Sequence, residues 1–187
     1  MQVANLPNLI TLGRVILVPF VFWLVLNGQM QPAFVLFLLA GISDGVDGYL
    51  AKRFGWTTEL GAYLDPLADK LLLVCIFIAL GVGGLLPSWL IIAVVTRDVL
   101  IVIGVVLTWM LANPVNIHPL VVSKFNTVSQ IGLAAVVLAD EAFRLGLDPL
   151  RGVLIWVTAA LIVASLAAYS RAWFLHMTGY ESGAPPG

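Results

Sequence analysis

The sequence predicts an all-α integral membrane protein with six transmembrane helices and a short interfacial segment at its N-terminus. Hydrophobic residues make up 61% of the 187 residues and charged residues only 10%, and the mean hydropathy is +1.05. Soluble domains carry about 25% charged residues, so this composition excludes an ordinary soluble fold. The apolar residues are grouped in six runs, most of them near the roughly 20 residues that a helix needs to cross a bilayer.

Turn residues separate the six runs. Asn27-Gly28 follows the first run and Gly81–Pro87 follows the third, and neither segment carries a charge. Phe54–Thr57 breaks the second run from the third, and Asn5–Thr11 forms the interfacial lead-in to the first. We therefore expect helices at Arg14–Leu26, Pro32–Ala51, Leu60–Val82, Pro87–Leu111, Val121–Leu138 and Leu150–Phe174.

The positions of Lys and Arg predict the orientation in the membrane. Arg144 and Arg151 are exceptions, in a loop that also holds acidic residues. The uncharged turns after the first and third helices fall on the opposite side. We expect a multi-pass protein of the bacterial inner membrane, with both termini and the active site facing the cytoplasm. The basic residues on the cytoplasmic side, or near it, are Arg14, Lys52, Arg53, Lys124 and Arg171.

The length predicts one membrane domain over residues 1–177, followed by a disordered tail over 178–187 that is rich in Gly and Pro. Met1–Leu12 has no Lys or Arg, so we do not expect a cleaved signal peptide. Cys75 is the single cysteine, which excludes an intrachain disulfide. The net charge is -1 and no basic run is present, so no nucleic-acid partner is expected.

Four aspartates interrupt the apolar runs where the second and third helices adjoin. An ionisable side chain at a helix centre costs about 2.5–3.5 kcal/mol to insert into a membrane, so it needs a partner or a function. Asp44 and Asp47 are three residues apart, and Asp65 and Asp69 are four apart. Residues at these spacings lie on one side of a helix. The short connection makes the two helices antiparallel neighbours, so we expect the four carboxylates to converge near the cytoplasmic surface.

The predicted cluster calls for a counter-charge. Neighbouring carboxylates raise one another's pKa values and disfavour the ionised state. Lys52, Arg53 and Lys70 would offset part of this repulsion. Clustered oxygen ligands suit hard divalent cations such as Mg²⁺ or Mn²⁺, and two His with one Cys do not suggest a zinc or copper site. The sequence therefore predicts a Mg²⁺ or Mn²⁺ site.

Small residues flank the aspartates, namely Gly45, Gly48, Ala51, Gly61 and Ala62. Glycine lets a ligand approach the backbone closely, and beside carboxylates this indicates a place for a metal-bridged nucleotide phosphate. Any one of these small residues taken alone is more often a packing residue of a membrane helix. Charges near helix ends are commonly solvated, which is the simplest interpretation of Lys52, Glu59, Arg144 and Arg151. A purely structural role is a much weaker interpretation for all four aspartates together.

The segment Asp44–Asp69 resembles the signature of the CDP-alcohol phosphatidyltransferase family, D-x-x-D-G-x-x-A-R, eight residues, and then G-x-x-x-D-x-x-x-D. Lys52 stands where the family usually has Arg, with Arg53 directly after it, so the charge is kept but its donor geometry changes. The six-helix layout extends the resemblance to nearly the whole chain. The matching positions are Asp44, Asp47, Gly48, Ala51, Gly61, Asp65 and Asp69.

The resemblance implies a metal-dependent enzyme of phospholipid biosynthesis. It would transfer a phosphatidyl group from CDP-diacylglycerol to an alcohol hydroxyl and release CMP. Two divalent ions would be held by Asp44, Asp47 and Asp65, and Asp69, also near the metals, would be the base that deprotonates the acceptor. A homodimer is also implied. The expected donor-binding residues are Asp47, Gly48, Ala51, Lys52, Arg53 and Gly61.

Four further segments bear on the acceptor. Asn5–Arg14 and Asp65–Lys70 resemble the branch of the family with glycerol-type acceptors, which includes phosphatidylglycerophosphate synthases and cardiolipin synthases. Thr96–Leu100 and Ser123–Gln130 resemble the cardiolipin synthases more closely. The fourth helix has a single cation, which is few for a phosphomonoester dianion. We therefore expect phosphatidylglycerol as acceptor, with glycerol 3-phosphate as the alternative.

Arg14, Arg97 and Lys124 are the residues expected to bind the acceptor's phosphate. For Arg97 the structural alternative is a buried ion pair with Asp98, and for Lys124 it is a side chain that reaches out to the interface. An ion-coupled transporter is the main alternative of another class, because carboxylates in membrane helices also carry ions. No second copy of the aspartate pattern is found, as internal repeats of a transporter would require. A structural membrane protein would not need the cluster.

Overall fold

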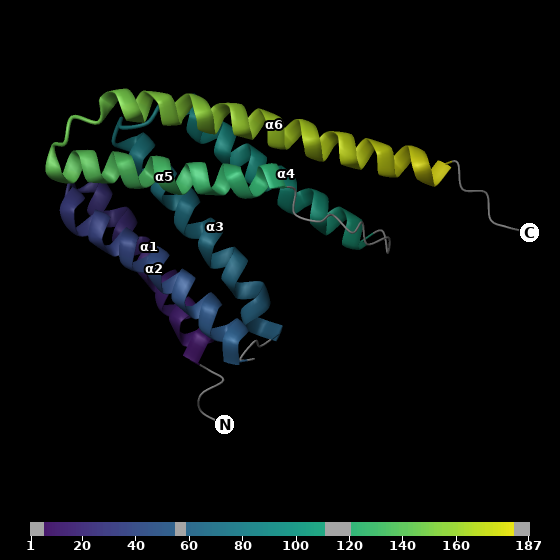
Figure 1. The fold of residues 1–187 in the computed structure, drawn as a ribbon, viewed down its shortest axis with the longest axis horizontal. Coiled ribbons are helices and arrows are strands. Elements are labelled where there is room, and N and C mark those ends of the chain that lie inside the picture. The colour runs from purple at the N-terminus through teal and green to yellow at the C-terminus, as the bar shows by residue number, and fades with distance from the viewer. Residues whose placement is uncertain (1–5, 55–58, 111–120, 182–187) are drawn as a thin grey trace, which may run out of the picture.

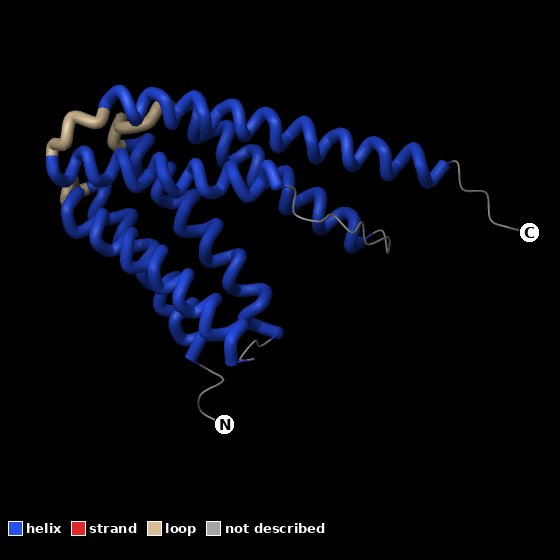
Figure 2. Tube along the Cα trace, viewed as in Figure 1, coloured by secondary structure: helices blue, strands red, loops and turns tan. Residues whose placement is uncertain are grey.

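The computed structural model describes the backbone of residues 6–54, 59–110 and 121–181, and side chains within 12–43, 70–103 and 122–171. In these ranges the chain forms six α-helices and contains no strand, which confirms the all-α prediction (Figure 2). The helices are α1 (Leu6–Leu26), α2 (Met30–Phe54), α3 (Glu59–Val82), α4 (Ser88–Met110), α5 (Val121–Phe143) and α6 (Asp148–Glu181).

Three helices, α1, α5 and α6, extend furthest beyond the predicted apolar runs. α1 begins at Leu6, so the expected interfacial segment is continuous with the first helix, and Pro7 lies in the first turn, where proline is tolerated. α5 continues through Asp140 and Glu141 to Phe143, because helical geometry does not require apolar side chains. α6 runs to Glu181, four residues into the segment predicted as a tail.

From a common end of the molecule, α1, α2 and α3 extend in one direction and α4, α5 and α6 in another (Figure 1). The α1–α2, α3–α4 and α5–α6 loops gather at one end (Figure 2). α1 packs against α2 and α3, while α5 packs against α6 and α2 and runs beside α6 (Figure 1). The end of α2 and the start of α3 both lie at the end opposite these loops (Figure 1). α1 therefore contacts both helices that carry the aspartates.

The interior is apolar over most of its length. Val21, Phe77, Leu90 and Leu133, from four different helices, are fully buried. Burial of apolar side chains between helices fixes the helix pairs through close packing. Polar and charged side chains are also buried among the described residues, namely Arg14, Arg97, Asp98, Asn126, Gln130, Thr158 and Ser165.

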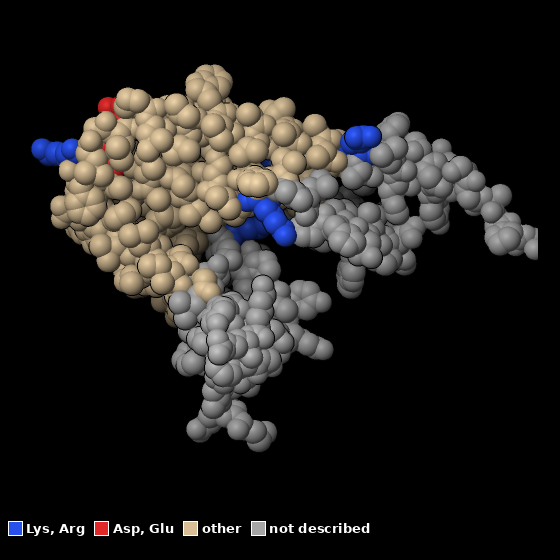
Figure 3. All heavy atoms as spheres, viewed as in Figure 1, with Lys and Arg blue, Asp and Glu red and all other residues tan. Residues whose placement is uncertain are grey.

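The outer surface is also apolar. Trp23, Val82, Ile92, Val128 and Trp156 are each more than half exposed, and contiguous apolar surface of this kind marks contact with lipid or another protein. On the visible face of the described part, Figure 3 shows few Lys, Arg, Asp or Glu, and they lie toward the edges of that part and where it meets the residues drawn in grey.

Two helical segments are long and apolar enough to cross a membrane, Val122–Phe143 and Asp148–Arg171. Three shorter apolar stretches occur among the described residues, at Leu12–Leu26, Met30–Ser43 and Lys70–Val82. The membrane character of the chain is therefore supported. Six membrane crossings stay a prediction.

Candidate functional site

The four aspartates lie on the helices where the sequence predicts them. α2 carries Asp44 and Asp47, and α3 carries Asp65 and Asp69. The predicted donor-binding residues fall on the same two helices, but all of these side chains lie outside the described ones. Their convergence, and the metal site, stay predictions. Among the side chains that the structure describes, no group of three or more His, Cys, Asp or Glu is placed to hold a metal ion.

Arg14 brings a buried positive charge to this region from α1. Its side chain is 2% exposed and borders a cavity of about 380 Å³. Gly41 of α2 and Leu73 of α3 line the same cavity. Gly41 precedes Asp44 by three residues and Leu73 follows Asp69 by four, which is about one helical turn in each case. The cavity beside Arg14 is therefore lined by residues about one helical turn from Asp44 on α2 and from Asp69 on α3.

Arg97 is the centre of a second polar group, which joins α3, α4, α5 and α6. Its Nη1 donates to Asp98 Oδ1 at 2.5 Å, and its Nη2 donates to Ser123 Oγ at 2.5 Å. Nε and Nη2 also donate to Ser165 Oγ, at 3.3 and 3.0 Å. Lys70 Nζ lies 3.2 Å from the same Asp98 oxygen. We call Lys70, Arg97, Asp98, Ser123 and Ser165 the Arg97 network.

The Arg97 network begins directly beside a predicted catalytic position, since Lys70 follows Asp69 on α3. Two cations and one carboxylate give it a formal charge of +1. The ion pair considered as the structural alternative for Arg97 is present. Four of the five guanidinium N–H donors bond to described side chains, and one Nη1 hydrogen makes no bond to the described residues, so an acceptor phosphate could bind there without displacing a serine or Asp98.

Removing Asp98 should destabilise the protein strongly. Asp98→Ala leaves Arg97, which is 1% exposed, buried without its anionic partner, and breaking a buried pair in this way costs about 3–5 kcal/mol. Thermal unfolding in detergent measures the loss. Glu141→Ala is the matched control, because Glu141 is exposed and lies 3.7 Å from Arg151, a contact worth about 0–1 kcal/mol. Equal loss in both variants would contradict a stabilising role for the network.

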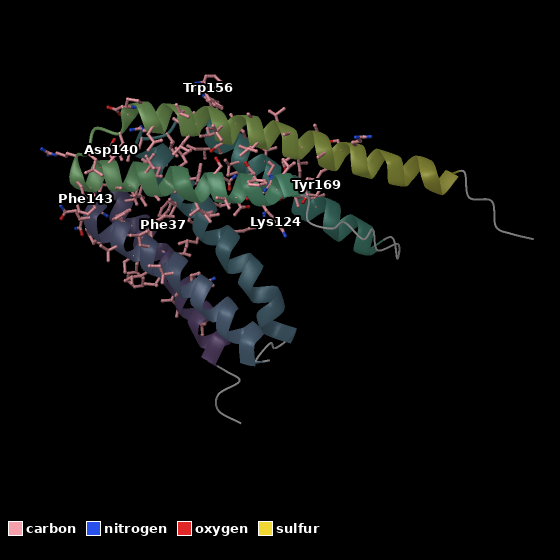
Figure 4. The ribbon with its side chains drawn as sticks, in the orientation of Figure 1. Phe37, Lys124, Asp140, Phe143, Trp156 and Tyr169 are labelled. Carbon is pink, nitrogen blue, oxygen red and sulfur yellow. The ribbon has the colours of Figure 1, made fainter. Side chains whose placement is uncertain are left out.

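The third acceptor candidate, Lys124, lies one residue after Ser123 and is exposed. Figure 4 shows Lys124 near the start of α5 and Phe143 at the other end of the same helix. Of the three predicted acceptor residues, Arg14 and Arg97 are therefore buried within the helix bundle and Lys124 is accessible.

Sequence reasoning missed several of the buried polar residues. Ser165 stands in the apolar α6 and is 68 residues from Arg97, so no local pattern pairs the two. In the sequence, Asn126 and Gln130 stand out only as part of the Ser123–Gln130 segment that resembles the cardiolipin synthases, yet both are fully buried. Ser123, Asn126, Thr127 and Gln130 follow the i, i+3, i+4, i+7 spacing of one helix side, and this is the signal that would have identified them.

Comparison with known proteins identifies the chain's relatives. Residues 4–164 match the profile of the CDP-alcohol phosphatidyltransferase family. A chloroplastic CDP-diacylglycerol–glycerol-3-phosphate 3-phosphatidyltransferase from rice is 38% identical over 185 residues, covering 88% of this chain and 56% of the relative. The corresponding enzyme of Bacillus subtilis is 32% identical over 186 residues, covering 90% and 95%. A CMP-forming cardiolipin synthase from rat is 31% identical over 184 residues, covering 89% and 60%.

The chain thus spans little more than half the length of its rice and rat relatives and nearly all of its Bacillus relative. The family match covers most of the helical part of the chain, from α1 through the first half of α6. It includes both helices that carry the aspartates. The chain belongs to the CDP-alcohol phosphatidyltransferase family.

Proposed function

We propose that this phosphatidyltransferase uses CDP-diacylglycerol as donor and a glycerol-type alcohol as acceptor, with phosphatidylglycerol favoured, so that the product is cardiolipin. The observation that carries the proposal is the Arg97 network, a net positive, partly buried group that includes Lys70, the residue after Asp69 on α3. The active site would face the cytoplasm, and the enzyme would act as a homodimer in the bacterial inner membrane.

In the proposed reaction the acceptor oxygen forms a bond to the phosphorus that carries diacylglycerol. The bond from that phosphorus to the CMP oxygen breaks, and CMP leaves with the electron pair. Asp69 accepts the hydroxyl proton, a role that a carboxylate in a charged cluster can be tuned to perform. Asp44, Asp47 and Asp65 would hold two Mg²⁺ or Mn²⁺ ions, with Asp69 close by. Such ions neutralise the pyrophosphate charge that would repel the attacking oxygen.

The charge of the described groups supports a phosphodiester acceptor. Asp98 cancels one of the two positive charges of Lys70 and Arg97. A net charge of +1 suits the single negative charge of the phosphodiester in phosphatidylglycerol. A phosphomonoester dianion would be better matched by several free cations, and Arg97 has already used four of its five donors.

Glycerol 3-phosphate is the second candidate, because the rice and Bacillus relatives are named as glycerol-3-phosphate phosphatidyltransferases. The identity of the lipid product distinguishes phosphatidylglycerol from glycerol 3-phosphate as the acceptor. Purified protein with CDP-diacylglycerol and Mg²⁺ or Mn²⁺ is given each acceptor in turn, and lipid products are separated by mass. Cardiolipin from phosphatidylglycerol is the expected result. Phosphatidylglycerophosphate formed only from glycerol 3-phosphate would overturn the acceptor proposal and leave the aspartate chemistry unchanged.

Lys124→Ala should raise the acceptor's apparent KM by about tenfold and leave the donor's KM within about twofold, since a charged hydrogen bond to the acceptor phosphate would be lost. Steady-state kinetics with each substrate varied in turn measures the split. Arg144→Ala is the control, because Arg144 is also exposed but follows Phe143 at the far end of α5 (Figure 4). Unchanged acceptor KM in Lys124→Ala would remove this residue from the acceptor site.

A further inference from the structure

Asn126 and Gln130 are buried polar side chains with unmade hydrogen bonds. Asn126 is 0% exposed, and in the part of the chain that the structure describes neither its Nδ2 nor its Oδ1 has a hydrogen-bond partner. Gln130, one turn further along α5, is 1% exposed and its Nε2 also has no partner. The observation for Asn126 does not depend on which way the amide is oriented, because both of its polar atoms are unpaired.

The neighbouring polar side chains of α5 are satisfied. Ser123 Oγ accepts a hydrogen bond from Arg97, and Thr127 Oγ1 donates to the Ser123 carbonyl at 3.2 Å. Ser129 Oγ and Thr158 Oγ1 of α6 are hydrogen-bonded at 2.7 Å. Membrane helices normally pair such groups across helices in this way. Three carboxamide atoms without a partner in the same stretch, two in Asn126 and one in Gln130, therefore need an explanation, which a bound polar group would provide.

Asn126 lies close along α5 to Ser123, a member of the Arg97 network. Asn126 is three residues after Ser123, so the two stand on the same side of α5, where neighbouring Cβ atoms are about 5–6 Å apart. Ser123 binds Arg97, Arg97 binds Asp98, and Asp98 pairs with Lys70, the residue after Asp69. A group held by Asn126 would thus be next to the positive charge proposed for the acceptor's phosphate, on the side of α5 that faces this network.

The chemistry of a carboxamide defines what fits there. It presents both a donor and an acceptor, and a hydroxyl group needs both. A phosphate oxygen only accepts hydrogen bonds, and an acyl chain makes none. We propose that Asn126 and Gln130 form a subsite for the hydroxyl groups of the glycerol unit of the acceptor. The inference rests on the proposed function, and it assigns these residues to acceptor specificity and positioning.

The subsite would act by orientation. With the acceptor's phosphate toward Lys124 and the Arg97 network, a hydroxyl bound by Asn126 fixes the rotation of the glycerol unit. The hydroxyl that reacts is then presented to Asp69 in one arrangement, which contributes to rate through correct positioning. An alcohol with no second hydroxyl group would lose this contact and should be a poor acceptor.

The test replaces each amide with an apolar residue of similar size. Asn126→Leu and Gln130→Leu should each raise the apparent KM of the acceptor about fivefold to tenfold, with the donor's KM changed less than about twofold. Thermal unfolding in detergent should be unchanged or higher, because an unsatisfied buried group is removed. Ser129→Ala is the matched control, since Ser129 is on the same helix and already paired, and its acceptor KM should stay at the wild-type value.

Phosphatidylglycerol and glycerol 3-phosphate are tested in separate arms, because both contain the glycerol unit. Raised KM for whichever acceptor the wild-type protein uses supports the subsite. Unchanged acceptor KM in both Leu variants, with wild-type activity intact, overturns it and indicates that only water satisfies the two amides. An equal rise in donor and acceptor KM also overturns it. A wild-type protein that releases no CMP with either acceptor refutes the proposed function itself, and the subsite with it.

Should one Leu variant fail to fold, binding gives an independent result. Acceptor added without donor should raise the unfolding temperature of the wild-type protein and of Ser129→Ala. The same addition should raise it less for Asn126→Leu, or for Gln130→Leu if only that variant folds. Equal stabilisation of all proteins by the acceptor would contradict the subsite.

Discussion

Asp69→Asn is expected to abolish phosphatidyl transfer and to leave donor binding largely intact. An amide cannot accept the hydroxyl proton, and loss of a general base typically lowers a rate by about 10²–10⁴-fold. Asn keeps the size of Asp and a hydrogen-bonding oxygen, so the helix and the neighbouring Lys70 should be little disturbed. Single-turnover rates and CDP-diacylglycerol affinity, measured on the same preparation, separate chemistry from binding.

Asp65→Asn is the control that is needed to interpret the result for Asp69→Asn. A metal ligand should affect the donor's pyrophosphate as well as the reaction, so donor affinity and turnover should fall together. Equal loss of donor affinity in the Asp65 and Asp69 variants would show that Asp69 is another metal ligand. Wild-type turnover in Asp69→Asn would exclude it from the proton transfer altogether.

Removal of divalent cations should stop turnover completely. The four predicted carboxylates repel one another, and the donor adds a charged pyrophosphate to the same region, so neither is expected to bind productively without a counter-ion. Excess EDTA should reduce CMP release to background. Mg²⁺ or Mn²⁺ added beyond the chelator should restore it.

The control for chelation is stability in the absence of substrate. Unfolding temperature should change much less than activity in EDTA, because the described core is built from apolar packing and the Arg97 network, and these do not depend on the proposed metal ligands. Full turnover in excess EDTA would remove the metal proposal. Irreversible loss of activity with a collapse in unfolding temperature would show that the cations are mainly structural.

The helices could be predicted from the sequence because each contains an apolar run bounded by turn residues. The positions of the helix ends were harder to predict. Hydropathy falls at Asp140 and Glu141 although α5 continues to Phe143, and it falls near the C-terminus although α6 reaches Glu181. In both cases the backbone remains helical where the side chains become polar, and hydropathy does not register that difference.

The sequence predicted the family from the aspartates of the functional site, but it did not predict the side chains that bind Arg97. The spacing of Asp44, Asp47, Asp65 and Asp69 indicated the family, which the comparisons confirm, and membership supports a transferase over the transporter considered as an alternative. The partners of Arg97 could not be predicted, because Ser123 and Ser165 are brought to it by helix packing across long sequence separations. The relatives act on two different acceptors by name, so the family does not determine the acceptor.

CMP release by the purified protein tests the central claim most directly. CDP-diacylglycerol, Mg²⁺ or Mn²⁺ and phosphatidylglycerol should give CMP and cardiolipin in equal amounts, and omission of the alcohol should give neither product. This stoichiometry follows from direct attack of the acceptor hydroxyl on the phosphatidyl phosphorus. Release of CMP without an alcohol, accompanied by phosphatidic acid, would show a hydrolase and contradict the account, as would the absence of CMP with every glycerol-type acceptor.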